Sequence, residues 1–351
     1  MTTADFGPAA TLPMLRLRAE LMRSVREFFD RRGYWEVDTP LLSAEIVVDA
    51  WLEPFACAWL PEPTQWQSTA SSLRYLQTSP EFAMKRLLAA GAEAIYQFGK
   101  VFRNGETGHR HNPEFTMIEW YRVGDDHHAQ MEVTEALVRT VITHARQRLT
   151  VSSRTARVDA VLAGPSFLRM SYDDAFAAAT GVKPLTAGTS ELHHLAERKQ
   201  LTPPPGLDAE DRDGWLNWLL AELIEPHLGR DIPVFLCDYP ASQAALAKTH
   251  RRDDGVEVAH RFELYIDGME FCNGYHELTD AAILRERIIA QSALREAAGY
   301  RPLPRDSRLL DAMDVGLPES AGVALGFDRL MMFAVGADKI DDVIPFPFDR
   351  A

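Results

Sequence analysis

The stretch from Arg103 to Arg122 carries the first pattern in the sequence that could do chemistry. It reads RNGETGHRHNPEFTMIEWYR and follows the apolar segment AIYQFGKVF. The apolar segment and PEFTMIEWY predict two strands, and the turn-rich GETGHRH between them predicts a β-hairpin. Arg103 ends the first strand, where its planar guanidinium could bind a phosphate through two parallel hydrogen bonds.

The returning strand of this hairpin has mixed faces. A period of two places on one face Phe115, Met117, Glu119 and Tyr121. A carboxylate and a phenol interrupt an otherwise apolar face, as expected for one side of a binding site for a cationic group. The alternative is a half-exposed sheet with ordinary surface charges, and the hairpin alone favours that alternative.

A second arginine and two glutamates strengthen the functional interpretation. Arg329 lies in the first turn of a predicted helix, where backbone N–H groups and the helix dipole favour an anion. With Arg103, it predicts nucleotide binding without a glycine-rich loop. Glu270 and Glu277 in MEFCNGYHEL offer hard oxygen ligands suited to Mg²⁺ that bridges phosphates. Each residue alone is consistent with a surface salt bridge, but their coincidence around one sheet favours a site.

The first of the elements that position these residues is a predicted helix. It runs from Leu17, and Gly33 ends it. The segment YWEVDTPLL predicts a strand ending in Pro40, at an edge or an interface. LRYLQTSPEFAMKRLLAAG predicts strand, turn and helix, with Ser79 as the cap.

The C-terminal part returns to a β pattern. VAHRFELYIDGMEFCNGYHELTD predicts two strands joined by a tight turn at Asp267 and Gly268. GVALGF predicts a buried strand, and DRLMMFAVG predicts a helix capped by Asp328 and ended by Gly336.

Helical patterns fill much of the middle of the chain. Residues from Met131 to Arg148 and a segment containing Trp215 to Ile224 predict helices. We therefore expect a single domain over residues 1–351 of α+β class, an antiparallel sheet flanked by helices, with a mostly helical insertion at about residues 125–230.

Composition limits the partners. The 37 basic and 51 acidic residues give a net charge of −14, which disfavours long contact with RNA. Cys57, Cys237 and Cys272 form no CxxC pair, which indicates a reducing compartment and no zinc knuckle. No apolar run approaches the roughly 20 residues that span a bilayer. A cytoplasmic protein is expected.

Three further motifs do not predict a phosphate-binding loop or a metal site. Gly99 and Lys100 lack the other residues of a phosphate-binding loop. HELTD from His276 lacks the second histidine of a zinc protease. His127 and His128 in VGDDHHAQ lie in a polar helix-start context that favours a solvated loop over a metal site.

Three segments carry a resemblance to a known family. FFDRRGYWEVDTPLL, FRNGETGHRHNPEFTMIEWY and GVALGFDRLMMF resemble the signatures of class II aminoacyl-tRNA synthetases, most closely the lysyl-tRNA synthetases. The first signature begins so near the N-terminus that no anticodon-binding domain is expected ahead of it. With YPASQAALAK and GVALGFDRL, the chain resembles the elongation factor P lysine ligases.

The resemblance implies an activity. It implies an AMP-forming ligase that uses ATP and Mg²⁺ to activate (R)-β-lysine as an aminoacyl-adenylate. The ligase then attaches that group to a lysine side chain of elongation factor P, with no tRNA as partner. It also implies a homodimer built on the first helix and the strand ending in Pro40. The alternatives are a free-standing enzyme that charges tRNA, and an inactive paralogue that only binds ligand.

The resemblance also implies site residues. Those expected to hold the amino acid are Ser79, Pro80, Glu81, Tyr121 and Glu277, and the hairpin adds Glu119 for the substrate amine. Those expected around ATP are Arg103, Asn104, Gly105, Asn112, Glu270, Phe271, Gly326 and Arg329. Arg103 and Arg329 are the expected catalytic residues, and Glu270 and Glu277 the expected metal ligands.

Two positions depart from the related enzymes. The family has glutamate two residues after the first arginine, where this chain has Gly105, and Glu106 would substitute through a shifted loop. Ala324 stands where lysyl-tRNA synthetases have glycine, and its added methyl predicts a shift of preference toward the β-amino isomer of lysine.

Overall fold

The computed structural model describes residues 6–60, 64, 72–149 and 156–351. Two compact units divide the chain. The first contains Met1–Gly124, Ala136–Leu162 and Thr279–Ala351, and the second contains Asp125–Glu135 and Ala163–Leu278. The predicted extent of a single domain with one insertion stays a prediction.

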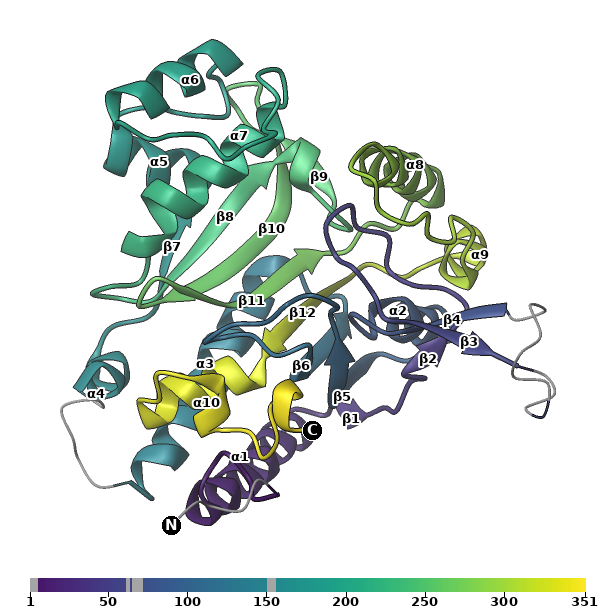
Figure 1. Ribbon diagram of the computed structural model, residues 1–351, viewed down its shortest axis with the longest axis vertical. Coiled ribbons are helices and arrows are strands. Elements are labelled where there is room, and N and C mark those ends of the chain that lie inside the picture. Colours follow the sequence, from purple (N-terminus) through teal and green to yellow (C-terminus); the bar gives the residue numbers. More distant parts are fainter. Residues whose placement is uncertain (1–5, 61–63, 65–71, 150–155) are drawn as a thin grey trace. The chain divides into compact units, whose positions relative to one another are not determined.

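The strands of the first unit form two groups (Figure 1). One group follows the order β1-β5-β6-β12, in which β1 and β5 are parallel and the other pairs are antiparallel. The other is a three-stranded antiparallel sheet in the order β2-β4-β3. The bounds are β1 Trp35–Glu36, β2 Leu42–Ser43, β3 Ala56–Trp59, β4 Ser72–Leu76, β5 Ala94–Phe102, β6 Glu114–Val123 and β12 Ser320–Gly326.

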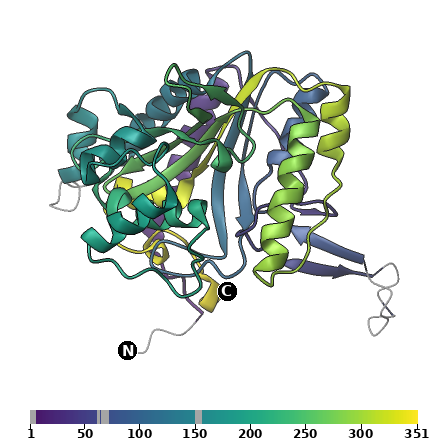
Figure 2. The ribbon, with the colours of Figure 1, turned by 90° about the horizontal axis from the view of Figure 1, so that it is seen from above.

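Helices flank these strands. The helix bounds in the first unit are α1 Leu12–Asp30, α2 Glu81–Ala89, α4 Ala156–Ala163, α8 Ala281–Ala297, α9 Arg308–Val315 and α10 Phe327–Val335, with short turns η6 Ile340–Asp342 and η7 Phe348–Arg350. Helix α3 (His127–Arg146) begins in the second unit and continues in the first. Helices α8 and α9 lie side by side in both views (Figure 1 and Figure 2).

The predicted β-hairpin is confirmed. Strands β5 and β6 pair without a break from Ala94 opposite Arg122 to Phe102 opposite Glu114. Arg103 follows the end of β5, and its backbone N–H donates to Pro113 O at 2.8 Å. The two faces of β6 have different surroundings, because Trp120 packs on Phe29 of α1 with ring centroids 5.3 Å apart. Glu119 and Tyr121 therefore lie on the face opposite to α1.

A buried ion pair ties α1, α10 and the hairpin together. Asp328 pairs with Arg18 of α1 at 2.6 Å and accepts a 2.7 Å hydrogen bond from the N–H of Thr116. Arg18 also donates to the Thr116 hydroxyl at 2.7 Å. The prediction of Asp328 as a helix cap is wrong: α10 begins at Phe327 after Gly326, and the Asp328 carboxylate is committed to these partners. Gly336 ends the helix in the left-handed conformation, as predicted.

Several predicted boundaries shift. Helix α1 begins at Leu12, because Thr11 accepts from the backbone of Met14 and caps an earlier turn than the apolar pattern indicated. Strand β1 ends at Glu36, before Pro40. The cap position of α2 is Pro80, although the Ser79 hydroxyl still accepts from the N–H of Glu81 at 3.0 Å.

The strands of the second unit pair in the order β11-β10-β8-β7, with β9 added to β10. Its strands are β7 Leu168–Ser171, β8 Val234–Pro240, β9 Thr249–Arg251, β10 Glu257–Ile266 and β11 Met269–His276. Its helices are α5 Tyr172–Thr180, α6 Thr189–Arg198 and α7 Arg212–Leu219, followed by the π-helix η3 Leu220–Ile224 and the 3-10 helices η4 Glu225–His227 and η5 Ala241–Gln243. Their buried apolar side chains form the core of this unit.

The turn between β10 and β11 agrees with the sequence. Asp267 and Gly268 both have positive φ, at 54° and 70°, which is the backbone that a two-residue hairpin turn requires. The turn fixes which residues of β11 oppose β10.

Within the described residues, none of the helices combines the length and the apolar character needed to cross a membrane.

Candidate active site

A buried carboxylate and two hydroxyls form the centre of the candidate site in the first unit. Glu119 on β6 is only 1% exposed. Its Oε2 accepts from the hydroxyl of Ser79 at 2.8 Å, and its Oε1 accepts from the hydroxyl of Tyr121 at 2.7 Å. Ser79 and Tyr121 were both predicted to hold the amino acid, and the structure places them on the same carboxylate.

Sequence alternation explains half of this arrangement. Glu119 and Tyr121 are two residues apart on a strand, so their side chains project from the same face. Ser79 comes from the loop before α2, where Pro80 begins the turn of the helix. The hydroxyl of Ser79 therefore both supports the first turn of α2 and bonds Glu119.

A second buried carboxylate belongs to Glu81, which forms a 2.6 Å ion pair with Lys85 one helical turn later. Lys85 is 1% exposed, and its Nζ lies 6.0 Å from the centre of the Tyr121 ring. Sequence reasoning missed Lys85. The sequence pattern that could have revealed Lys85 is an acid and a base four residues apart on α2. Such a pair usually lies on a solvated helix surface.

The electrostatics of the site centre on Glu119. Burial raises the pKa of its carboxyl from 4.5 to about 7, and the neighbouring charge of Glu81 adds to the rise. The hydrogen bonds from Tyr121 and Ser79 and the charge of Lys85 act in the opposite direction. A carboxyl with this pKa is poised to bind a cationic amine, because the incoming positive charge stabilises its ionised form.

Strand β12 contributes the residue opposite Glu119. Ala324 pairs with Glu119 across β12 and β6, and Gly322 pairs with Tyr121. Directly opposed residues project from the same face, with Cβ atoms roughly 5 Å apart. The methyl of Ala324 therefore lies on the same face of the sheet as the Glu119 side chain.

Arg103 lies at the end of the hairpin, half-buried against Phe115. Its guanidinium carbon is 5.2 Å from the Phe115 ring centre, and its Nη1 is 3.7 Å from Oε1 of Glu106. Its Nε is buried and has no hydrogen-bond partner among the described residues. A buried guanidinium nitrogen without a partner requires an acceptor, and a phosphate oxygen would satisfy it.

Arg329 lies in the first turn of α10 and contacts the hairpin loop. Its Nη2 is 2.5 Å from Nε2 of His111. A guanidinium can only donate, so this nitrogen of His111 is the acceptor and the ring is neutral there. Burial, and then the positive charge of Arg329, lower the pKa of His111. Sequence reasoning missed His111, which orients Arg329.

Three further candidates for the nucleotide site lie in the first unit. Asn112 holds the chain, since its side chain donates to Glu114 O and accepts from the N–H of Phe348, at 2.7 and 2.8 Å. The N–H of Asn104 donates to Glu53 O at 2.7 Å. Gly326 precedes α10.

Gly105 has a backbone that explains its identity. Its φ is +83°, a conformation in which a side chain is strained. A glutamate at this position would therefore need a different loop. Glu106 is the next acid, and it lies beside Arg103. The predicted substitution of Glu106 for the family glutamate stays a prediction.

The other candidates belong to the second unit. Glu270 and Phe271 lie on β11, where Glu270 opposes Tyr265 at a bulge in the pairing. Glu277 follows the strand, is 0% exposed and pairs with Ala247 through an isolated bridge. The assignment of Glu270 and Glu277 to Mg²⁺ stays a prediction.

One interpretation from the sequence is wrong. His127 is not solvated, because only 4% of its surface is exposed, whereas His128 is exposed. The expected helix start is confirmed, since α3 begins at His127.

Comparison with known families identifies the class of protein. A family model described as "tRNA synthetases class II (D, K and N)" matches residues 6–350. The chain therefore belongs to the class II tRNA synthetase family. The predicted α+β class, with an antiparallel sheet flanked by helices, is confirmed.

Curated relatives specify the branch of this family. The chain is 44% identical over 351 residues to a Vibrio cholerae protein named "Elongation factor P--(R)-beta-lysine ligase", covering 100% of both chains. It is 42% identical over 349 residues to the protein of that name from Vibrio vulnificus, covering 99% of both chains. The Yersinia enterocolitica protein of the same name is 41% identical over 350 residues, again covering 99% of both. The predicted resemblance and the predicted enzyme class, a ligase, are confirmed.

Proposed function

We propose that this enzyme activates (R)-β-lysine with ATP and transfers it to a lysine side chain of elongation factor P. Full-length relatives at 41–44% identity carry the corresponding name. The observation that carries the proposal is the buried Glu119 with its two hydroxyl partners, because such a site selects a cationic amine over a neutral side chain.

Recognition of the amino acid starts from charge. β-Lysine has two amino groups and one carboxylate, so a site for it needs anionic residues for the amines. An ammonium group bound at Glu119 replaces the solvation that burial removes from the carboxylate, and it lowers the pKa of that group from its raised value. Ser79 and Tyr121 hold the carboxylate in one orientation, so binding requires little rearrangement.

Activation forms a mixed anhydride. A carboxylate oxygen of the amino acid attacks the α-phosphorus of ATP, the new O–P bond forms, and the bond to pyrophosphate breaks. In this proposal Arg103 and Arg329 stabilise negative charge on the phosphate oxygens. The Nε of Arg103, which has no hydrogen-bond partner among the described residues, supports an anionic ligand there. Mg²⁺, when bound, would neutralise phosphate charge, and carboxylates such as Glu270 and Glu277 would be the hard oxygen ligands suited to hold it.

Transfer completes the reaction. The amine of the acceptor lysine, after losing a proton, attacks the adenylate carbonyl carbon, the amide bond forms, and AMP leaves. The net charge of −14 opposes binding of RNA and favours approach of a basic protein loop. We expect that association to weaken as the salt concentration rises.

The acceptor is tested by following a label. The enzyme is supplied with ATP, Mg²⁺ and labelled (R)-β-lysine, together with either elongation factor P or total tRNA. A second preparation of elongation factor P, with its acceptor lysine changed to arginine, is the matched control. We expect label only in the unmodified protein acceptor. Label in tRNA and not in protein would replace this proposal with the tRNA-charging alternative, and absence of ATP–pyrophosphate exchange would favour the inactive paralogue.

We also propose a cytoplasmic homodimer built on α1 and β1. Free cysteines at Cys57, Cys237 and Cys272 are consistent with a reducing compartment. Leu12 and Trp35 expose 73% and 54% of their surface, which supports burial of this face by a second copy. Light scattering at micromolar concentration tests the dimer. A mass near 39.4 kDa, the mass of one chain, would refute it.

A further inference from the structure

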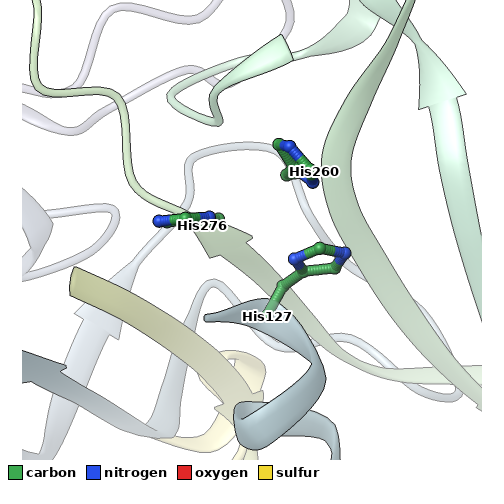
Figure 3. A group of neighbouring side chains, drawn as sticks. All are labelled: His127, His260 and His276. Atoms are coloured by element: carbon green, nitrogen blue, oxygen red, sulfur yellow. The ribbon is translucent and has the colours of Figure 1, made fainter. Parts of the chain in front are cut away.

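Three histidines from distant parts of the sequence meet within the second unit. His127 begins α3, His260 lies on β10 and His276 ends β11. Figure 3 shows the three side chains gathered together from these elements. One ring nitrogen from each lies within 4.8 Å of the other two. We call this group the histidine cluster.

Burial makes the cluster unusual as a purely structural feature. The Nδ1 atoms of His127 and His260 are buried and have no hydrogen-bond partner among the described residues. Buried polar atoms are nearly always paired, because an unpaired one costs roughly 1–3 kcal/mol. Two such atoms on rings of one cluster indicate that a ligand outside the polypeptide completes it.

Burial favours the neutral form of two of these rings. Burial and then the neighbouring His128 lower the pKa of His127 to about 3. Burial and then His250 lower the pKa of His260 to about 4. Both rings are therefore neutral near pH 7 and carry a lone pair on one nitrogen, the form in which imidazole binds metals.

The spacing suits a transition metal. Imidazole nitrogens around tetrahedral Zn²⁺ lie about 2.1 Å from the metal and therefore about 3.4 Å from one another. The nitrogens of the cluster lie within 4.8 Å of one another, so each pair needs to approach by at most about 1.4 Å to reach this spacing. Three protein ligands leave a fourth position for water, as in catalytic zinc sites.

Neighbouring groups hold the rings in place. His250 of β9 stacks on His260, with ring centroids 4.2 Å apart and planes at 19°. Asp126, which caps the start of α3 by accepting from the N–H of Ala129 at 2.8 Å, places a negative charge next to His127. That charge favours a cation at the cluster.

We propose that His127, His260 and His276 form a binding site for one divalent transition-metal ion of the Zn²⁺ class. The site joins the start of α3 to β10 and to the end of β11. The proposal does not depend on the proposed reaction, since it rests on the positions of the three histidine side chains alone.

The test uses the full chain without a polyhistidine tag. After treatment with a chelator and its removal, the protein is titrated with Zn²⁺ by calorimetry. Co²⁺ then serves as a second probe, because tetrahedral Co²⁺ absorbs strongly in the visible. We expect one tight equivalent per chain, a tetrahedral Co²⁺ spectrum, and a rise in Tm of about 4 °C at a hundredfold excess over Kd.

The variants are His127→Gln, His260→Gln and His276→Gln, with His194→Gln as the matched control on the exposed surface of α6. Each cluster variant is expected to lose affinity by about a hundredfold or more, and the control to keep it. Thermal unfolding without metal establishes that each variant folds. If a cluster variant does not fold, the Co²⁺ spectrum of the unmodified chain decides the coordination.

Three results would overturn the proposal. The first is no binding to the unmodified chain. The second is binding that the three cluster variants retain, and the third is an equal loss in His194→Gln, which indicates adsorption to surface histidines.

Discussion

The hydroxyl of Tyr121 donates to Oε1 of Glu119 at 2.7 Å, from two residues further along the same face of β6. The other oxygen of this carboxylate accepts from Ser79. Both partners are neutral, so the hydrogen bonds orient Glu119 without cancelling its charge. A buried carboxylate held in this way keeps its charge available to a substrate amine.

The raised pKa of Glu119 makes stability depend on pH. Between about pH 4.5 and 7 the folded protein keeps a proton that the unfolded chain releases. Because the folded state then binds more protons, this carboxyl lowers stability as pH rises through that window. We expect the free energy of unfolding of the unmodified protein, relative to Glu119→Gln, to fall by about 1 kcal/mol per pH unit.

Urea unfolding of both proteins at pH 5, 6 and 7 measures this difference. Glu114→Gln is the control, since Glu114 is an exposed residue of the same strand. A difference between unmodified protein and Glu119→Gln that stays constant over this range contradicts the prediction.

Lys85 should be essential for stability. Lys85→Met leaves the buried Glu81 carboxylate without its 2.6 Å ion partner, and removing one member of a buried pair costs about 3–5 kcal/mol. The double variant Lys85→Met with Glu81→Gln removes the uncompensated charge and should recover most of the loss. Thermal unfolding reports both. A loss under about 1 kcal/mol would show that solvent screens the pair.

Arg103 should matter for activation more than for folding. We expect Arg103→Ala to slow ATP–pyrophosphate exchange by roughly a hundredfold or more, the effect of losing one donor that stabilises transition-state charge. Arg103→Lys should recover little, since an ammonium lacks the planar fork. Arg305→Ala, at an exposed arginine paired with Glu296, is the control. Near-normal exchange in Arg103→Ala would overturn the assignment.

Ala324 is expected to influence the choice between lysine isomers. Its methyl stands opposite Glu119, so Ala324→Gly opens space where the substrate amine binds. We expect the ratio of kcat/KM for α-lysine to that for β-lysine to rise by about tenfold, the usual effect of one methyl group. Ala321→Gly, on the other face of β12, controls for the flexibility of an added glycine. An unchanged ratio of kcat/KM values would show that Ala324 does not influence the choice between the isomers.

The sequence determined the local framework of the site. Alternation on β6 placed Glu119 and Tyr121 on one face, and the turn residues between β5 and β6 located the hairpin. The pattern of signatures identified the family, which the match over residues 6–350 bears out. These features depend on residues that are close in the sequence, so the sequence pattern predicts them.

Only the tertiary structure decided the partners that come from distant segments. Asp328 looked like a helix cap but pairs with Arg18. Lys85 drew no prediction from the sequence, but it is buried and paired with Glu81. His127 lies with His260 and His276, more than a hundred residues away. Burial and long-range pairing depend on how elements pack, and the period of a strand or a helix fixes which face a side chain takes but not what that face meets.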